Sequence, residues 1–422
     1  MPSDRSVRVV GFGAHNAAIG DLVHSAYTIT PPSERPADSS PGLGPLPPHL
    51  ESLATRRLCG VVSIDESAGT ALVQARCPFT QVVKVLAARG LMPLDVPATA
   101  GRTLGGAISR TSVGSAAFRV GQVGNSVLEM ELLAPSGDVI DAKPDGPNQE
   151  VFAGIVRGDG PGDHVIISAR LAVRAVPAFV ATRQIGFASP AELQEAMGSV
   201  IQSGGLDGEP VDFIEAVCAP ATGPVMSLGR LVGLAEAPHH AVTPSRYCGS
   251  GPTYADSLTP GSTDLLTLSD YLTRWEPDGY WRSARYGLRA LLVRKIWPAR
   301  LRGRSIYDRL DRFWDGPGQG LDQLIRQRSR TPRVFCEVAV PLDKFAQFAE
   351  SVATIAPGLP IWMAPLQTNP ADAATPPTTQ FEAYCGLWGP GAHQKTGHNP
   401  QAQAALVEAT TQASGHPTRP HP

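Results

Sequence analysis

Short apolar runs of β-strand type alternate with helical patterns along the first part of the chain. Residues 6–10, SVRVV, form a strand-like run that enters glycines at Gly11 and Gly13. Residues 60–75 predict two strands around a turn. Residues 78–94 predict a helix capped by Gly90, because apolar side chains recur there at helical spacing: Val82, Val83, Val85, Leu86 and Ala87.

The pattern of apolar and polar residues continues with a predicted hairpin and a long strand, and it changes near residue 178. Residues 125–144 predict strand, turn and strand, with Pro135, Ser136 and Gly137 in the turn. Residues 164–177 predict another strand. Further on, residues 190–205 predict a helix, residues 333–355 a strand and a helix, and residues 359–367 and 381–389 two strands.

These patterns predict two domains. A chain of 422 residues is longer than one typical domain. We expect a first domain over residues 1–178 and a second over residues 179–390. Residues 391–422 lack periodic apolar positions and are predicted to be a disordered tail.

Composition narrows the class of partner. The chain has 36 basic and 38 acidic residues and a formal net charge of -2, which argues against nucleic-acid binding and favours a small partner. Its 43 glycines and 40 prolines indicate a loop-rich globular protein.

Cysteine usage and hydropathy give an expected compartment. The six cysteines include no CxxC pair and no Cys/His cluster with zinc spacing, so we expect no metal and a reducing compartment. No signal peptide and no apolar run of about 20 residues is visible. We therefore expect a cytoplasmic protein, with any membrane contact peripheral.

Four motifs occur in a characteristic order: GFGAHN at residues 11–16, RTLGGAIS at 102–109, FRVGQVGNSVLEMELLAPSGDVI at 118–140 and RGDGPGDHVIIS at 157–168. Together they resemble the PCMH-type FAD-binding domain of the vanillyl-alcohol oxidase superfamily. The later segments FIEAVCAP, VFCEVAVPLDKFAQF, LPIWMAPLQ and FEAYCGLWG look like the cap domain of its delta-24 sterol reductase branch. The resemblance implies an α+β fold, in which an FAD-binding domain precedes a cap, or substrate, domain of antiparallel sheet and helices.

The resemblance implies which residues contact FAD. The first glycine loop would wrap the pyrophosphate, and its N–H groups can form an anion nest, although tight turns are the plainer alternative. His15 stands one position after the place where some members attach the flavin covalently, so we expect non-covalent binding. The implied cofactor-binding residues are Gly11, Phe12, Gly13, Ala14, His15, Gly105, Gly106, Ala107, Ile108, Ser115, Gly121, Gly160, Gly162 and Val165.

The chain departs from the family pattern in the fourth motif. Asp163 and His164 stand where members usually have Phe-Gly, unless the register shifts so that Gly160 or Gly162 takes the place of that glycine. Members also usually have a strand and helix before the first loop and a closing segment after the cap. These departures motivate an alternative, a flavin-free protein that uses the same cavity to bind or cyclise a hydrophobic metabolite.

Catalytic residues are less defined. A histidine beside carboxylates can act as a general base, which makes His164 a candidate, although a polar surface loop is the plainer explanation. The candidates in the second domain are Tyr271, Tyr280, Arg285 and Tyr286.

The second domain contains a basic and aromatic block, YGLRALLVRKIWPARLRGR. It predicts either a helix on an anionic membrane surface or a cap helix whose arginine stems cover apolar surface. The function that the resemblance implies is an FAD-dependent oxidoreductase acting on a small lipophilic alkene or alcohol.

Overall fold

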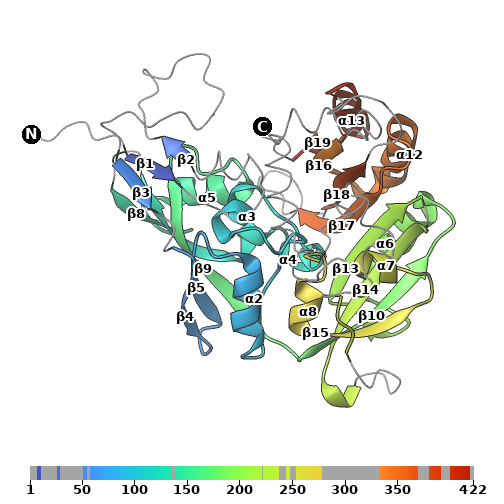
Figure 1. Ribbon diagram of the computed structural model, residues 1–422, viewed down its shortest axis with the longest axis horizontal. Coiled ribbons are helices and arrows are strands. Elements are labelled where there is room, and N and C mark those ends of the chain that lie inside the picture. The colour runs from blue at the N-terminus through green and yellow to red at the C-terminus, as the bar shows by residue number, and fades with distance from the viewer. Residues whose placement is uncertain are drawn as a thin grey trace, which may run out of the picture.

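The computed structural model describes most of the chain from residue 58 onward. The described residues are 7–10, 26–28, 51–54, 58–134, 136, 138–220, 222–236, 244–247, 253–277, 333–368, 380–390 and 400–418. Two parts are distinguished below: the N-terminal part (residues 58–176) and the C-terminal part (residues 179–418), each built on its own antiparallel sheet (Figure 1).

The N-terminal part contains a six-stranded sheet of order β4-β5-β9-β7-β8, with β6 paired to β9. Its strands are β4 (Val61–Asp65), β5 (Thr70–Gln74), β6 (Leu91–Pro93), β7 (Val127–Leu133), β8 (Val139–Ala142) and β9 (Val165–Ala175). Its helices are α2 (Phe79–Ala87), α3 (Leu104–Ser109), α4 (Ala117–Val120), the 3-10 helix η3 (Val123–Ser126) and α5 (Gln149–Arg157). A small sheet of β1 (Val7–Val10), β2 (Ala26–Thr28) and β3 (Glu51–Ala54) precedes it.

In helix α2 the residues that recur at helical spacing in the sequence form the buried face of the helix. Its Phe79, Val82, Val83 and Leu86 are buried, and Gly90 takes the left-handed conformation, with φ +67°, three residues after the helix. Each buried side chain of this size contributes about 1.5–3 kcal/mol. The predicted helix, and the predicted strands on both sides of it, are confirmed.

The C-terminal part contains an eight-stranded sheet of order β15-β10-β14-β13-β17-β18-β16-β19. Its strands are β10 (Phe179–Gly186), β13 (Phe213–Ala219), β14 (Gly223–Val232), β15 (Thr263–Thr267), β16 (Arg333–Pro341), β17 (Ile361–Thr368), β18 (Gln380–Pro390) and β19 (His416–Pro417). A separate ribbon pairs β11 (Gly205–Leu206) with β12 (Glu209–Pro210). The helices are α6 (Pro190–Ser203), η4 (Leu234–Glu236), α7 (Tyr254–Ser257), α8 (Leu268–Leu272), η7 (Leu342–Lys344), α12 (Phe345–Ile355) and α13 (Pro400–Gln412).

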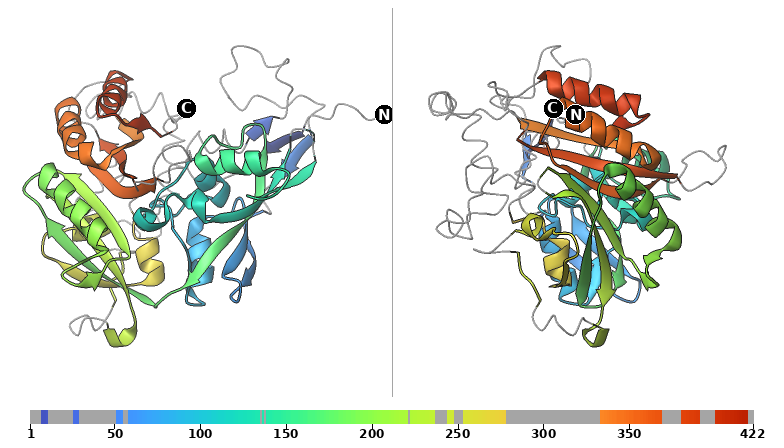
Figure 2. Two further views of the ribbon diagram at one scale, coloured as in Figure 1. Left: turned by 180° about the vertical axis from the view of Figure 1, so that it is seen from behind. Right: turned by 90° about the vertical axis from the view of Figure 1, so that its right-hand side faces the viewer.

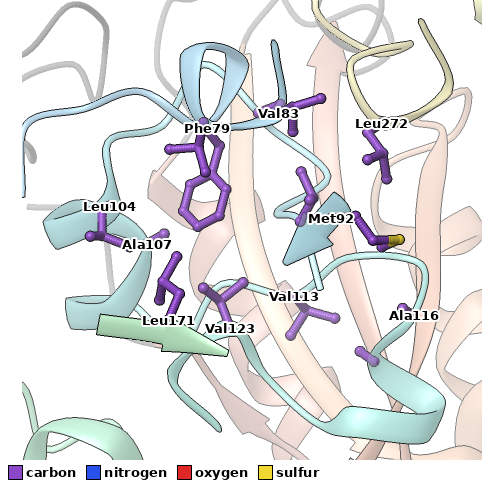
Figure 3. Close-up of a cluster of buried hydrophobic side chains, with 14 of the residues drawn as sticks. Phe79, Val83, Met92, Leu104, Ala107, Val113, Ala116, Val123, Leu171 and Leu272 are labelled. Carbon is purple, nitrogen blue, oxygen red and sulfur yellow. The ribbon is translucent and has the colours of Figure 1, made fainter. Parts of the chain in front are cut away.

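The two faces of the eight-stranded sheet have different partners. Helices α6, α12 and α13 lie over one face (Figure 2), and Ile214, Met363 and Cys385 belong to the hydrophobic cluster beneath them. Alternate residues, among them Trp362 and Tyr384, belong to a cluster that continues into the N-terminal part. Figure 3 shows some of this shared core, from Phe79 on α2 to Leu272 on α8. The two parts therefore share one core.

The prediction of a disordered tail over residues 391–422 is wrong for residues 400–418. Helix α13 buries Leu406 and Ala409 and is followed by β19, which pairs with β16. Beside Leu406, its buried positions are the small Ala409 and the polar Thr410, so its apolar period is weak in the sequence. Gly415 allows the close approach to β16, because a Cβ on it would lie 2.4 Å from the carbonyl oxygen of Ala339.

The chain passes from the six-stranded to the eight-stranded sheet between β9 and β10, where the pattern of apolar and polar residues changes. The domain boundary at residue 178 nevertheless stays a prediction. The α+β class, with antiparallel sheets and several helices, is confirmed.

Candidate functional site

Helix α3 carries the Gly-Gly motif and begins directly against the end of β5. The N–H groups of Leu104 and Gly105 donate to the carbonyl oxygens of Cys77 (2.9 Å) and Ala75 (2.8 Å), and Gly106 N–H donates to the capping Thr103 Oγ1. A Cβ on Gly105 would lie 3.2 Å from the Cβ of Ala75. Gly105 therefore permits tight packing of helix on strand, while Gly106 stays half-buried.

The next two predicted residues, Ala107 and Ile108, are fully buried in the hydrophobic core. Their role in this structure is packing. Gly121 ends α4 with φ +74°, a conformation that side chains rarely adopt.

A turn at residues 112–116, here called the 112–116 turn, connects α3 to α4 and is held by a buried carboxylate. Asp95, which is 1% exposed, accepts from the N–H groups of Gly114 (2.6 Å) and Ala116 (3.2 Å), one on each oxygen. A Cβ on Gly114 would lie 1.9 Å from the carbonyl oxygen of Val96, so the turn requires glycine there. Burial raises the pKa of Asp95 to about 7, although its backbone hydrogen bonds and Arg274 favour the ionised form.

The C-terminal part binds the same turn from the other side. The backbone N–H of Ile214 on β13 donates to the carbonyl oxygen of Ser115 (2.8 Å), and Arg274 Nη2 donates to Ser115 Oγ (3.2 Å). Ser115, predicted from the resemblance, is thus a buried joint between the two parts.

Arg274 belongs to a buried polar group, the Arg274 network, formed by Ser115, Glu215, Arg274, Trp275 and Trp362. One Glu215 oxygen accepts from Arg274 Nε (3.0 Å) and contacts Nη2 (2.8 Å), and the other accepts from both indole N–H groups (3.0 and 2.9 Å). The carboxylate is 1% exposed and bonded on both oxygens. The network neutralises the arginine charge inside the core.

Tyr271, a predicted catalytic candidate, lies under Arg274. Its ring centroid is 3.8 Å from the guanidinium carbon, and its hydroxyl is 3.5 Å from Ser115 Oγ. Burial raises the pKa of Tyr271 far above its usual value. Its surroundings in this structure are those of a buried packing residue.

A second buried polar group, the Arg102 cluster, is formed by Arg102, Ser112, Glu337 and Tyr384. Arg102 Nη1 donates to Ser112 Oγ (2.8 Å), and Nη2 lies 3.4 Å from Glu337 Oε1. Tyr384 Oη donates to Glu337 Oε2 (2.8 Å). Residues 102 and 112 flank α3 on either side, so the cluster joins both ends of this helix to β16 and β18.

The glycine-rich fourth motif forms the end of α5 and the turn into β9. Gly158, Gly160 and Gly162 have φ values of +102°, +74° and +58°. A Cβ on Gly162 would meet no atom within 4 Å, whereas one on Gly158 would lie 2.3 Å from Thr111 Cγ2. The loop therefore needs its glycines for conformation. Val165, predicted at the site, is buried where β9 begins.

His164 turns back on its own loop. Its Nδ1 lies 3.2 Å from the carbonyl oxygen of Pro161, and Asp159 pairs with Arg157 at the exposed surface. The hydrogen bond described for His164 is thus within its own loop, and its role as a general base stays a prediction.

Several predicted residues lie outside the described part of the chain. These are Gly11, Phe12, Gly13, Ala14 and His15 in the first loop, and Tyr280, Arg285 and Tyr286 with the basic block.

The sequence analysis did not identify Asp95, Arg102, Glu215, Glu337 or Tyr384. A signal existed for two of them, since FIEAV and FCEVAV each place one glutamate inside an apolar strand. A charge at such a position is costly unless it is paired. Nothing local marks the other three.

A buried polar atom that lacks a hydrogen-bond partner in the protein can mark the place where a polar cofactor binds. Ser126 Oγ is 1% exposed and, within the described chain, has no hydrogen-bond partner. It lies in η3, which contacts α3, α5 and β9. An unpartnered hydroxyl in a segment that contacts α3, α5 and β9 fits a polar ligand between these elements.

The described residues contain no group of three or more His, Cys, Asp or Glu side chains arranged to hold a metal ion. Among the described helices, none has the length and apolar character needed to span a bilayer.

Known proteins and protein families resemble part of this chain. Residues 50–143 match a family model described as FAD binding domain. Over 98 residues the chain is 35% identical to decaprenylphosphoryl-beta-D-ribose oxidase of Mycolicibacterium smegmatis. That match covers 23% of this chain and 21% of the relative, about a fifth of its length. The matched stretch holds α2, α3, Asp95 and the 112–116 turn. FAD is the cofactor of this protein, and the PCMH-type FAD-binding fold is confirmed.

Proposed function

We propose that this protein is an FAD-dependent oxidoreductase whose substrate binds at the Arg102 cluster. The observation that carries the proposal is this buried group of a guanidinium, a carboxylate and a phenol. It joins the helix of the FAD-matched stretch to the sheet of the C-terminal part. Buried polar groups at a junction of two sheets are a common setting for a reaction site.

The residues of the cluster suit oxidation of an alcohol. Bound FAD supplies a two-electron acceptor for hydride. The protein must then take the hydroxyl proton, and the Glu337 carboxylate can accept it directly or through Tyr384 Oη. Arg102, 3.4 Å from Glu337, favours the ionised carboxylate that this role needs.

The name of the relative supports a hydroxylated, lipophilic substrate, because it joins a ribose to a decaprenylphosphoryl group. We extend this to the present chain as a proposal: a small lipophilic alcohol, with peripheral membrane contact and a cytoplasmic location as further parts of the proposal. No nucleic-acid partner is proposed.

Reduction of an alkene is the second candidate, in line with the resemblance to the delta-24 sterol reductase branch. It requires a proton donor in place of a base. Tyr384 Oη is the candidate donor, because burial followed by the charge of Glu337 raises its pKa well above the usual value, so the phenol carries a proton before the reaction.

Absorbance spectroscopy of the purified protein tests both candidates. We expect a flavin spectrum that bleaches when a lipophilic alcohol is added without oxygen. Glu337→Gln should keep the flavin spectrum and slow bleaching roughly a hundredfold or more. Glu209→Gln, at an exposed ion pair with Arg230, is the matched control. Bleaching by a reductant followed by reoxidation with an alkene would favour the second candidate. A protein that neither contains nor takes up flavin would exclude both.

A further inference from the structure

The 112–116 turn is held by two buried charges on opposite sides. Asp95, from the loop after β6, takes the N–H groups on either side of Ser115. Arg274, from the C-terminal part, takes the hydroxyl of Ser115 itself. Both Asp95 and the turn lie within residues 50–143, the stretch that matches an FAD binding domain.

The balance of charge around the turn depends on one proton. Arg274 and Glu215 neutralise each other, whereas among the described residues Arg274 is the cation that acts on Asp95, from a greater distance. Two further titratable groups face the Arg274 guanidinium, Tyr271 and Tyr254, and burial raises the pKa of each phenol and keeps it neutral. The fold therefore keeps a carboxyl group whose ionisation is disfavoured by burial, at a point where two backbone donors require both of its oxygens.

The two protonation states hold the turn differently. An ionised carboxylate accepts one N–H bond on each oxygen, as observed. A protonated carboxyl group presents one O–H donor, so one of the two N–H groups loses its charged acceptor. Asparagine would have the same defect, because its NH₂ group faces one of the two backbone donors.

We propose that Asp95 is a positioning residue of the FAD site. In its ionised form Asp95 accepts the N–H groups of Gly114 and Ala116 and so keeps the 112–116 turn in the conformation that binds FAD. Protonation of Asp95 weakens these hydrogen bonds and lets the turn change conformation. The proposal rests on FAD binding by the matched stretch and is independent of the reaction proposed above. It predicts that FAD binds more weakly as pH falls, by the loss of one charged hydrogen bond.

The dissociation constant of FAD, measured by flavin fluorescence on dilution of the holoprotein, tests this from about pH 5.5 to about pH 8.5. In the unmodified protein we expect a roughly ten- to hundredfold weakening toward low pH, in a one-proton step. Asp95→Asn should bind FAD weakly at every pH, and its dissociation constant should not show the one-proton step. Asp212→Asn, which alters another carboxylate bonded to a backbone N–H (Leu231, 2.8 Å) away from the turn, should keep it.

Opposite results would overturn the proposal. They are a dissociation constant that does not vary with pH, or a step that persists in Asp95→Asn. If Asp95→Asn does not fold, infrared spectroscopy of the unmodified protein decides. A protonated carboxyl band should disappear over the same pH range in which FAD affinity rises, and its absence at low pH would contradict the assignment. Failure of every alcohol and alkene to react would exclude the proposed reaction and leave this test unaffected.

Discussion

Single buried residues, more than surface charges, join the two parts of this molecule. Glu215 is the centre of the Arg274 network, where its oxygens accept from one guanidinium and two indoles. Its burial would be unfavourable without these partners. Removing its charge would leave Arg274 uncompensated inside the core.

We predict that Glu215→Gln lowers the free energy of unfolding by about 3–5 kcal/mol. Urea denaturation would measure the change. Glu209→Gln breaks the exposed pair with Arg230 and should change stability by less than about 1 kcal/mol. Equal losses in the two variants would show that burial of the Arg274 network does not matter.

Asp95 gives the protein without FAD a pH-dependent stability of defined sign. Its pKa is raised from the usual 3.8 to about 7, so between these values the folded state holds one proton more than the unfolded state. Stability from this group is therefore greatest at low pH and falls as pH rises toward about 7, by up to about 1.4 kcal/mol per pH unit.

Denaturation of the FAD-free protein across this pH window, compared with Asp95→Asn, checks the prediction. The difference in unfolding free energy between the two should shrink as pH rises and then become constant. A difference that grows with pH would mean that the hydrogen bonds of Asp95 outweigh its burial.

At the scale of elements, α4 is too short to be stable alone and depends on the C-terminal part. Phe118 is buried in the cluster under α6 and α12, and α4 packs against β17. Arg119 donates to the carbonyl oxygens of Gly204, at the end of α6, and Val211, directly after β12. This helix of the N-terminal part is thus embedded in the other part.

We predict that Phe118→Ala destabilises the protein by about 3–5 kcal/mol, since it leaves a cavity between α4 and the cluster. Leu128→Ala, on a side chain of β7 that is 41% exposed, should cost well under half as much. Chemical denaturation of both variants would measure this. Similar losses would argue that α4 can move to fill the space.

The element pattern was largely predictable from the sequence, whereas the buried polar groups were not. Helix α2 and the strands β4, β5, β7, β8 and β9 follow from local apolar periods, whereas β6 was not predicted. Helix α13 was missed because its buried positions beside Leu406 are the small Ala409 and the polar Thr410, which give a weak apolar period. Arg102 and Glu337 are 235 positions apart and Asp95 and Gly114 are 19 apart, so no local spacing indicates that they meet.

At the scale of the whole molecule, the shared core makes the two parts one cooperative unit. Trp275 and Trp362 are buried in the C-terminal part, and none of the six tryptophans lies in residues 50–143, the stretch that matches an FAD binding domain. We predict that flavin release and tryptophan fluorescence show coincident thermal transitions. Release of flavin well before the tryptophan transition would show that the N-terminal part opens independently.

The embedding of α4 also limits how such chains can exchange segments. A recombination point at residue 178 looks natural in the sequence, but it would separate Phe118 and Ser115 from the surfaces that receive them. A functional chimera would have to inherit the 112–116 turn and α4 together with the C-terminal part that surrounds them. The unit of exchange in this molecule is therefore discontinuous along the chain.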